Sequence, residues 1–178
     1  MEQINLMQAK GGQGTSVLAC SLALAAAGEG RYVRLDGQDR GELAAVLGVR
    51  GDGPVISRLY LGASDEASPD LVCFDGPAEA GTNLLVLRPC YLALRQALNS
   101  GATGGAAGIV LVTEPARALR ADVVAAVTGL PVIATVPFRA DIARAVDAGV
   151  LADRLPDVLR TAARQVLAVL GAAGKEVA

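Results

Sequence analysis

The residues best suited to chemistry lie near the N-terminus, at positions 8–16, which read QAKGGQGTS. Their three glycines allow positive φ angles and bring backbone N–H groups close to an anion. A helix beginning near Thr15 would add the positive end of its dipole, and Ser16 stands where a hydroxyl could hold Mg²⁺. This pattern predicts a phosphate site. The alternative is a small-residue turn that only links a strand to a helix.

One residue departs from the usual phosphate-binding sequence, G-x-x-x-x-G-K-[ST]. Thr15 occupies the position of its lysine, and the only lysine nearby is Lys10. The only other lysine of the chain is Lys175, which favours a specific role for Lys10 over surface decoration. Because threonine cannot offset phosphate charge, we expect weakened binding and turnover.

The composition excludes several kinds of site. The chain of 178 residues has no histidine, which excludes Ser-His-Asp and Cys-His catalysis and histidine-bound metals. Cys20, Cys73 and Cys90 are far apart, and we interpret them as small buried residues of a cytoplasmic protein rather than a disulfide or a reactive thiol. The net charge of −2 gives no global basic field. No apolar run reaches the length of about 18 residues that predicts a membrane span.

Strand and helix patterns alternate along the chain. Short aliphatic runs, mostly without alternation and so typical of strands buried on both faces, occupy residues 4–7, 32–35, 71–74, 84–87, 109–112 and 132–136. Helical spacing occupies residues 15–27, 41–47, 91–98, 119–127, 141–148 and 156–170. The pattern predicts an α/β fold, a three-layer α/β/α architecture with a mostly parallel sheet. We expect a single domain over residues 1–171, ended by Gly171, and a flexible tail over 172–178; residues 55–61 have no clear state.

With these elements in place, AKGGQGTS resembles the deviant Walker A loop of the ParA/MinD family, K-G-G-x-G-K-[ST]. The resemblance implies a P-loop NTPase-like fold and a nucleotide held by Lys10, Gly11, Gly12, Gln13, Gly14, Thr15, Ser16 and Val17. Lys10 matches the signature lysine, which reaches the phosphates of the partner subunit in a dimer, and is therefore a catalytic candidate. Ser16 matches the Mg²⁺-binding residue.

Two further segments carry acidic candidates. Residues 32–48 resemble a family segment with two aspartates: without gaps, Asp36 matches the first and Gln38 the second, whereas a shifted register puts Asp36 on the second and Arg34 on the first. Either way, the resemblance makes Asp36 a catalytic candidate; the alternative is a turn or cap residue at the end of a strand.

The segment PDLVCFDGPAEAG, residues 69–81, resembles a Walker B strand, in which Asp75 holds Mg²⁺ through water. Gly76 and Pro77 resemble the switch that follows it. Only 13 residues separate Asp75 from Pro89, where the family usually has another helix, so the switch region is expected to be trimmed.

Later segments resemble the family more loosely. Residues 85–98 resemble a strand-to-helix element that faces the dimer partner, so Arg88 and Arg95 are candidates for interface or acidic-ligand contacts, the alternative being solvated arginines. Residues 129–149 resemble the final strand and loop, where Pro137 and Phe138 would flank adenine.

The resemblance implies ATP and Mg²⁺ as cofactors, a homodimer, and an unidentified partner protein. We expect an ATP-dependent dimerisation switch in intracellular positioning or partitioning, with weak or absent ATPase activity; the alternative is a pseudo-ATPase scaffold that does not use nucleotide. DNA binding is possible but not favoured, because aspartates interleave with the arginines of residues 116–164. A membrane role would need a lysine-rich amphipathic C-terminal helix, whereas residues 157–170 carry only Arg160 and Arg164.

Overall fold

The computed structural model describes residues 1–63, 68–115, 117 and 119–173. Within them the strands are β1 (Glu2–Met7), β2 (Val33–Gly37), β3 (Gly53–Ile56), β4 (Leu59–Leu61), β5 (Leu71–Asp75), β6 (Thr82–Leu87), β7 (Gly108–Thr113) and β8 (Val132–Pro137). The helices are α1 (Thr15–Gly28), α2 (Arg40–Leu47), α3 (Tyr91–Asn99), α4 (Ala121–Thr128), α5 (Ala140–Asp147) and α6 (Asp157–Ala173).

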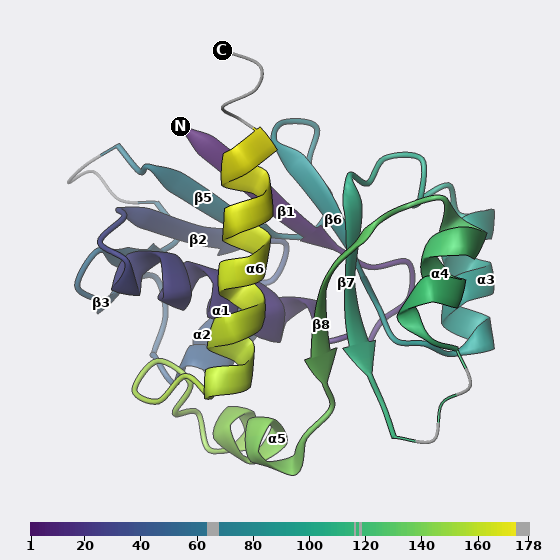
Figure 1. Cartoon of the computed structure of the whole chain (residues 1–178). Helices are drawn as coiled ribbons and strands as arrows, with labels where there is room; N and C mark the ends of the chain where they lie inside the picture. The colour runs from purple at the N-terminus through teal and green to yellow at the C-terminus, as the bar shows by residue number, and fades with distance from the viewer. Residues whose placement is uncertain (64–67, 116, 118, 174–178) are drawn as a thin grey trace.

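The strands form a single sheet in the order β3-β4-β2-β5-β1-β6-β7-β8, parallel except for β3 at one edge. Helices α1, α2 and α6 pack on one face, and α3 and α4 pack on the other face over β6 and β7 (Figure 1). In β6 the alternation is clear, because Leu84 and Val86 join the first core while Leu85 and Leu87 join the second. The predicted three-layer α/β/α fold with a mostly parallel sheet is confirmed.

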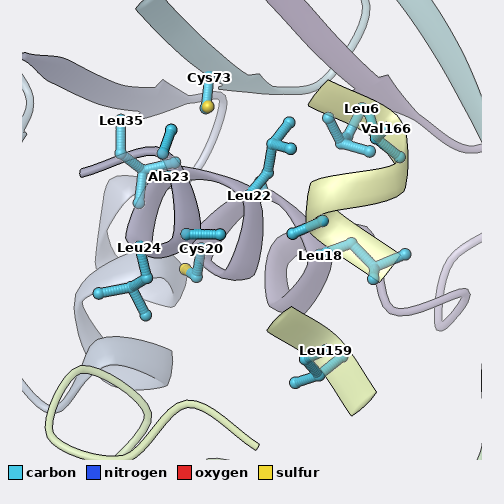
Figure 2. Close-up of a cluster of buried hydrophobic side chains, with 14 of the residues drawn as sticks. Leu6, Leu18, Cys20, Leu22, Ala23, Leu24, Leu35, Cys73, Leu159 and Val166 are labelled. Atoms are coloured by element: carbon cyan, nitrogen blue, oxygen red, sulfur yellow. The ribbon is translucent and has the colours of Figure 1, made fainter. Parts of the chain in front are cut away.

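Helix α1 is the centre of the larger core. Nearly all of its residues are buried, because the sheet, α2 and α6 surround it. Leu18 and Leu22 lie on the side of α1 nearer α6, and Cys20 and Leu24 lie on the side nearer α2 (Figure 2). This position explains the apolar run at residues 17–27. It also fixes the loop that precedes α1 on a rigid support.

Two of the three cysteines belong to this core, as predicted. Cys20 and Cys73 are buried free thiols, whereas Cys90 is only partly buried. Burial raises the pKa of Cys20 and of Cys73 far above the ordinary range, so both remain uncharged thiols. Cys90 instead caps α3, where its sulfur accepts the Ala93 N–H at 3.4 Å.

The connection from β5 to β6, residues 76–81, contains no helix and must cross β1, which lies between those strands. Asn5 of β1 is fully buried, and its amide donates to Ala80 O at 2.7 Å and to Asn83 Oδ1 at 3.0 Å. Gly81 has φ +89°, and a Cβ there would lie 2.5 Å from Gln3 O. The expectation that this connection lacks a helix is thus confirmed. The expectation that strands are apolar on both faces is wrong for β1, since Asn5 replaces the apolar contacts that a crossover helix would bring.

Two boundaries differ from the sequence-based expectations. Residues 55–61, which had no clear state, belong to the β3–β4 hairpin, whose turn places Arg58 at φ +69°. Helix α6 does not stop at Gly171 but continues to Ala173, since glycine is tolerated inside a helix at a cost of about 1 kcal/mol. Most of the expected tail, residues 174–178, lies outside the described residues. No helix in the described part of the chain is both long and apolar enough to cross a membrane.

Candidate functional site

A cleft of about 290 Å³ opens at the carboxyl ends of β1, β2 and β5. Ligands of open α/β sheets bind at this end of the strands. The predicted site residues that line the cleft are Lys10, Gly11, Thr15, Ser16 and Asp75, and the sequence analysis did not assign a role to two other lining residues, Asp39 and Glu42. The fold therefore brings together the lysine, the helix start and the Walker B carboxylate that the motifs predicted.

The glycine loop has the backbone that an anion site requires. Gly12 and Gly14 have φ values of +77° and +90°, which other residues rarely adopt. Gly14 is the N-cap of α1 and brings no side chain to its first N–H groups. Thr15 and Ser16 begin the helix at the cleft, so its first turn can donate to a phosphate there.

Gln8, which precedes the loop, was missed by the sequence analysis. Its side-chain carbonyl accepts the Thr15 hydroxyl at 2.8 Å and the Gln13 N–H at 3.3 Å. Thr15 is only 3% exposed, so its hydroxyl is committed to this contact. An uncharged amide oxygen thus occupies donors of the loop that a phosphate oxygen would use. Gln8 itself is exposed and can be displaced without unpacking the core.

Oxygen atoms gather around Ser16. Its hydroxyl donates to Glu42 Oε1 at 2.9 Å, and Asp39 caps α2 by accepting the Glu42 N–H at 3.0 Å. Burial raises the pKa of Asp75; the like charges of Glu42 and Asp39 act in the same direction, and a hydrogen bond from Ser16 opposes them. A divalent cation would relieve this crowding of carboxylates.

The donor set fits Mg²⁺, which prefers oxygen ligands and keeps several waters. Ser16 and Asp75 are the residues predicted to hold it, and Glu42 adds a third oxygen donor beside Ser16. Within the described ranges, no three His, Cys, Asp or Glu side chains could hold a metal by themselves. A cation here would complete its shell with the Ser16 hydroxyl, water or a phosphate.

Asp36, the predicted catalytic acid, is placed differently. It is not among the described residues that line the cleft. Its carboxylate accepts the Gly37 N–H at 2.9 Å and lies 3.6 Å from Arg40 Nε. Gln38, the other residue of that segment, does line the cleft, and its N–H donates to Asp75 O at 3.1 Å. The structure therefore places the Asp36 carboxylate beside Arg40 at the end of β2 rather than in the lining of the cleft, and its catalytic role stays a prediction.

A second cavity of about 270 Å³ lies on the other side of the loop, and is lined by Gly12, Gln13, Gly14, Val17, Pro137 and Phe138 together with aliphatic residues of α5 and β8. Its walls are mostly apolar, which suits a flat organic ring better than a phosphate. Pro137 and Phe138 are the residues predicted to flank adenine. The two cavities thus offer adjacent places for the two ends of a nucleotide.

Arg88 connects the glycine loop to Glu114 and Phe138. Its backbone N–H donates to Gln13 Oε1 at 2.8 Å, and its guanidinium donates to Gly12 O at 3.2 Å. The guanidinium pairs with Glu114 at 2.5 Å and lies 5.0 Å from the centre of the Phe138 ring. Arg88 is therefore an internal tether of the loop that also lines the second cavity, and its role as an interface or ligand contact stays a prediction.

Two other charged residues, Glu114 and Arg95, differ in their contacts. Hydrogen bonds from Arg117 and Arg88, together with their charges, hold the pKa of Glu114 below its ordinary value, so it stays ionised as the anchor of Arg88. Arg95 lies exposed on α3, without a hydrogen bond or ion pair to any other residue that the structure describes.

Comparisons with known proteins identify the fold. No family model and no curated protein matches the chain in sequence. Among solved structures, MinD of Pyrococcus horikoshii OT3 in complex with Mg-ADP has a TM-score of 0.74 at 18% identity, covering 92% of this chain and 93% of that one. A MinC:MinD cell division complex of Aquifex aeolicus gives 0.71 at 16% identity, covering 94% and 96%.

A ParA family ATPase of Chlorobium tepidum TLS gives a TM-score of 0.69 at 17% identity and covers 91% of this chain and 96% of that one. Identities this low establish the fold rather than the chemistry. The chain has the α/β fold of the MinD and ParA ATPases.

Proposed function

We propose that this chain is a ParA/MinD-like nucleotide-binding protein, in which Mg-ATP binds at the glycine loop and promotes a homodimer that engages a partner protein in intracellular positioning. One observation carries the proposal. An uncapped, glycine-led helix start and a Ser16–Asp75 oxygen pair converge on the same cleft. The structural similarity to a MinD that is bound to Mg-ADP, and to a MinD in complex with MinC, supports it.

Charge sets the form in which nucleotide would bind. Asp39, Glu42 and Asp75 line the cleft with a single cation, Lys10. A free triphosphate would meet net negative charge, whereas a Mg-nucleotide brings the missing positive charge with it. When bound, Mg²⁺ would screen the phosphate oxygens; Ser16 and Asp75 would orient it, and the loop N–H groups would hold the phosphates.

Hydrolysis would be slow. Thr15 is uncharged and cannot stabilise the negative charge that develops on the phosphates during hydrolysis. Gln38 lines the cleft where the resemblance implies a second aspartate. Lys10 is exposed, so its ammonium is free to reach a neighbouring subunit, as the resemblance implies. Nucleotide binding, rather than its hydrolysis, would thus control assembly.

Thermal unfolding in the presence and absence of Mg-ATP tests the proposal. A ligand that binds only the native state raises the melting temperature, by an amount that grows with ligand concentration. We expect a rise with Mg-ATP and, by light scattering after gel filtration, a nucleotide-dependent dimer that Lys10→Ala weakens. The absence of any stabilisation at millimolar Mg-ATP would contradict nucleotide binding.

The second candidate function is the nucleotide-independent scaffold. The Gln8–Thr15 hydrogen bond favours it, because it satisfies the loop without a ligand. A dimer of the same stability with and without Mg-ATP, formed equally well by Lys10→Ala, would select the scaffold over the switch.

A further inference from the structure

Helix α5 and the segment that leads into α6 lie side by side (Figure 1). A cavity of about 760 Å³, larger than either cavity beside the loop, is lined by residues of both. The polar groups of this arginine cavity are four arginines and two aspartates: Arg139, Arg144, Arg154, Arg160, Asp141 and Asp157. Four positive and two negative groups leave a net charge of two positive. The whole chain carries a net charge of −2, so the lining of this cavity is more positive than the chain as a whole.

The two aspartates are already used within the cavity wall. Arg139 Nε donates to Asp141 Oδ1 at 2.9 Å, and Arg160 Nε lies 3.7 Å from Asp157 Oδ1. A hydrogen bond at 3.1 Å from the guanidinium of Arg160 to Leu155 O also fixes its direction. These contacts orient two guanidinium groups at the rim and leave no carboxylate of the lining for the others.

Arg144 and Arg154 are the groups left over. Both are exposed, and neither guanidinium has a hydrogen bond or ion pair with another residue in the described part of the chain. A guanidinium presents a planar fork of donors that matches the oxygens of a phosphate or carboxylate. Two unpaired forks on the wall of one concavity form a site for an anion with more than one charged oxygen.

The remaining lining of the cavity is apolar: Ala145, Val150, Leu155, Pro156 and Val158. Its volume lies within the range of about 300–1,000 Å³ typical of small-molecule pockets. An extended polyanion would need arginines along a convex or flat track, whereas these converge on a hollow. The combination suits an organic body with a phosphorylated end.

We propose that the arginine cavity binds a small organic phosphate, whose phosphate oxygens are held by Arg144 and Arg154. Arg139 and Arg160, oriented by their aspartates, stand on either side of it. The apolar lining receives the organic part. No proton or bond is transferred, and the site is one of binding only.

The arginine cavity is separate from the proposed nucleotide cleft. Helix α5 lies between it and the cavity at the loop: Ile142 and Val146 line the loop side, and Arg144 and Ala145 line the arginine cavity. Of the four arginines, only Arg139 lines both. The inference therefore does not depend on the proposed function.

Inorganic pyrophosphate, titrated calorimetrically in EDTA, is a suitable probe. Without Mg²⁺ the acidic cleft repels it, so the arginine cavity is the only one of the two sites suited to take it. We expect binding to the native chain and an affinity about tenfold weaker for each of Arg144→Gln and Arg154→Gln, as expected for the loss of a charge-assisted hydrogen bond. Arg95→Gln, an equal change of charge on the exposed face of α3, should leave the affinity unchanged.

Two further controls separate the outcomes. Ser16→Ala, which alters the proposed nucleotide cleft, should not change pyrophosphate affinity; if it does, the probe binds at the loop and the inference fails. An absence of heat at millimolar pyrophosphate, or an equal loss in Arg95→Gln, would also overturn it. Salt-sensitive retention on duplex DNA or on phosphatidylglycerol vesicles, without pyrophosphate binding, would also overturn the inference, because it would assign the arginines to an extended binding surface.

Discussion

The cleft at the glycine loop and the arginine cavity beyond α5 are both concave, but they carry opposite charge. Three carboxylates surround a single lysine in the cleft, whereas four arginines outnumber two aspartates in the cavity. The glycine motif predicts an anion site, but the cleft beside it carries net negative charge and would repel an anion that comes without a metal. The difference teaches that backbone geometry and net charge are separate requirements. Under the proposed function, a loop that lacks its lysine would depend on the metal that accompanies the phosphate.

The largest expected effect separates the two sites. Asp75→Ala removes the carboxylate that would orient Mg²⁺, and we expect the affinity for Mg-ATP to fall on the order of a hundredfold. The Arg144→Gln/Arg154→Gln double variant should bind Mg-ATP as the native chain does. Calorimetry on both variants measures the effect, and a loss in the double variant alone would reverse the assignment of the two sites.

A second prediction compares Arg88, whose side chain is held by several contacts, with Arg144, whose guanidinium has no partner in the described part of the chain. Arg88→Ala removes the hydrogen bond to Gly12 O, the ion pair with Glu114 and the stacking on Phe138. We expect the free energy of unfolding to fall by about 2 kcal/mol. Arg144→Ala should change it by less than about 0.5 kcal/mol. Urea denaturation checks both, and equal losses would show that Arg88 is not a tether.

A third effect, about tenfold in affinity, concerns the Gln8–Thr15 contact. Thr15→Lys breaks this hydrogen bond and returns a cation to the loop, so Mg-ATP should bind about tenfold more tightly. Gln8→Ala frees the loop donors without adding charge and should have a smaller effect in the same direction. Calorimetry distinguishes them. If neither variant changes the affinity, the loop does not hold phosphate.

The smallest expected effect is on the pH dependence of stability. Because the pKa of Asp75 is raised in the folded state, ionisation of this carboxyl destabilises the fold. Its contribution is fully present below the ordinary carboxyl range and is lost as the pH rises through the raised pKa. Asp75→Asn should therefore melt at a higher temperature than the native chain at about pH 7, and at the same temperature near about pH 3. A gain that grows toward low pH would contradict the assigned direction.

The sequence predicted those parts of the molecule that depend on local pattern. Runs of aliphatic residues located most strands, and glycine spacing located the loop. Gln8, Glu42 and the inward turn of Arg88 were missed, because each depends on a partner brought close only by folding: Thr15, Ser16 and Glu114. Asp39 and Glu42 did leave a signal, since their spacing is that of a capping box at the start of a helix.

The position of Asp36 has a related cause. A match to a family segment fixes an order along the chain, but it does not fix which side chain at the end of a strand reaches the cleft. Here Asp36 turns to Arg40, and the cleft receives Gln38 instead. The arginines of the cavity were considered in the sequence only as a possible DNA-binding face, and their convergence on one cavity could not be predicted, because they come from two segments whose proximity is tertiary.

The most direct test of the central claim is calorimetric titration of the native chain with ATP, once with Mg²⁺ and once with EDTA. We predict binding with Mg²⁺ that is lost from the glycine loop in EDTA, because the carboxylates there then face an uncompensated triphosphate. Any weak binding that remains in EDTA should disappear in the Arg144→Gln/Arg154→Gln variant. Equal affinity in both titrations, unaffected by that variant, would contradict the account.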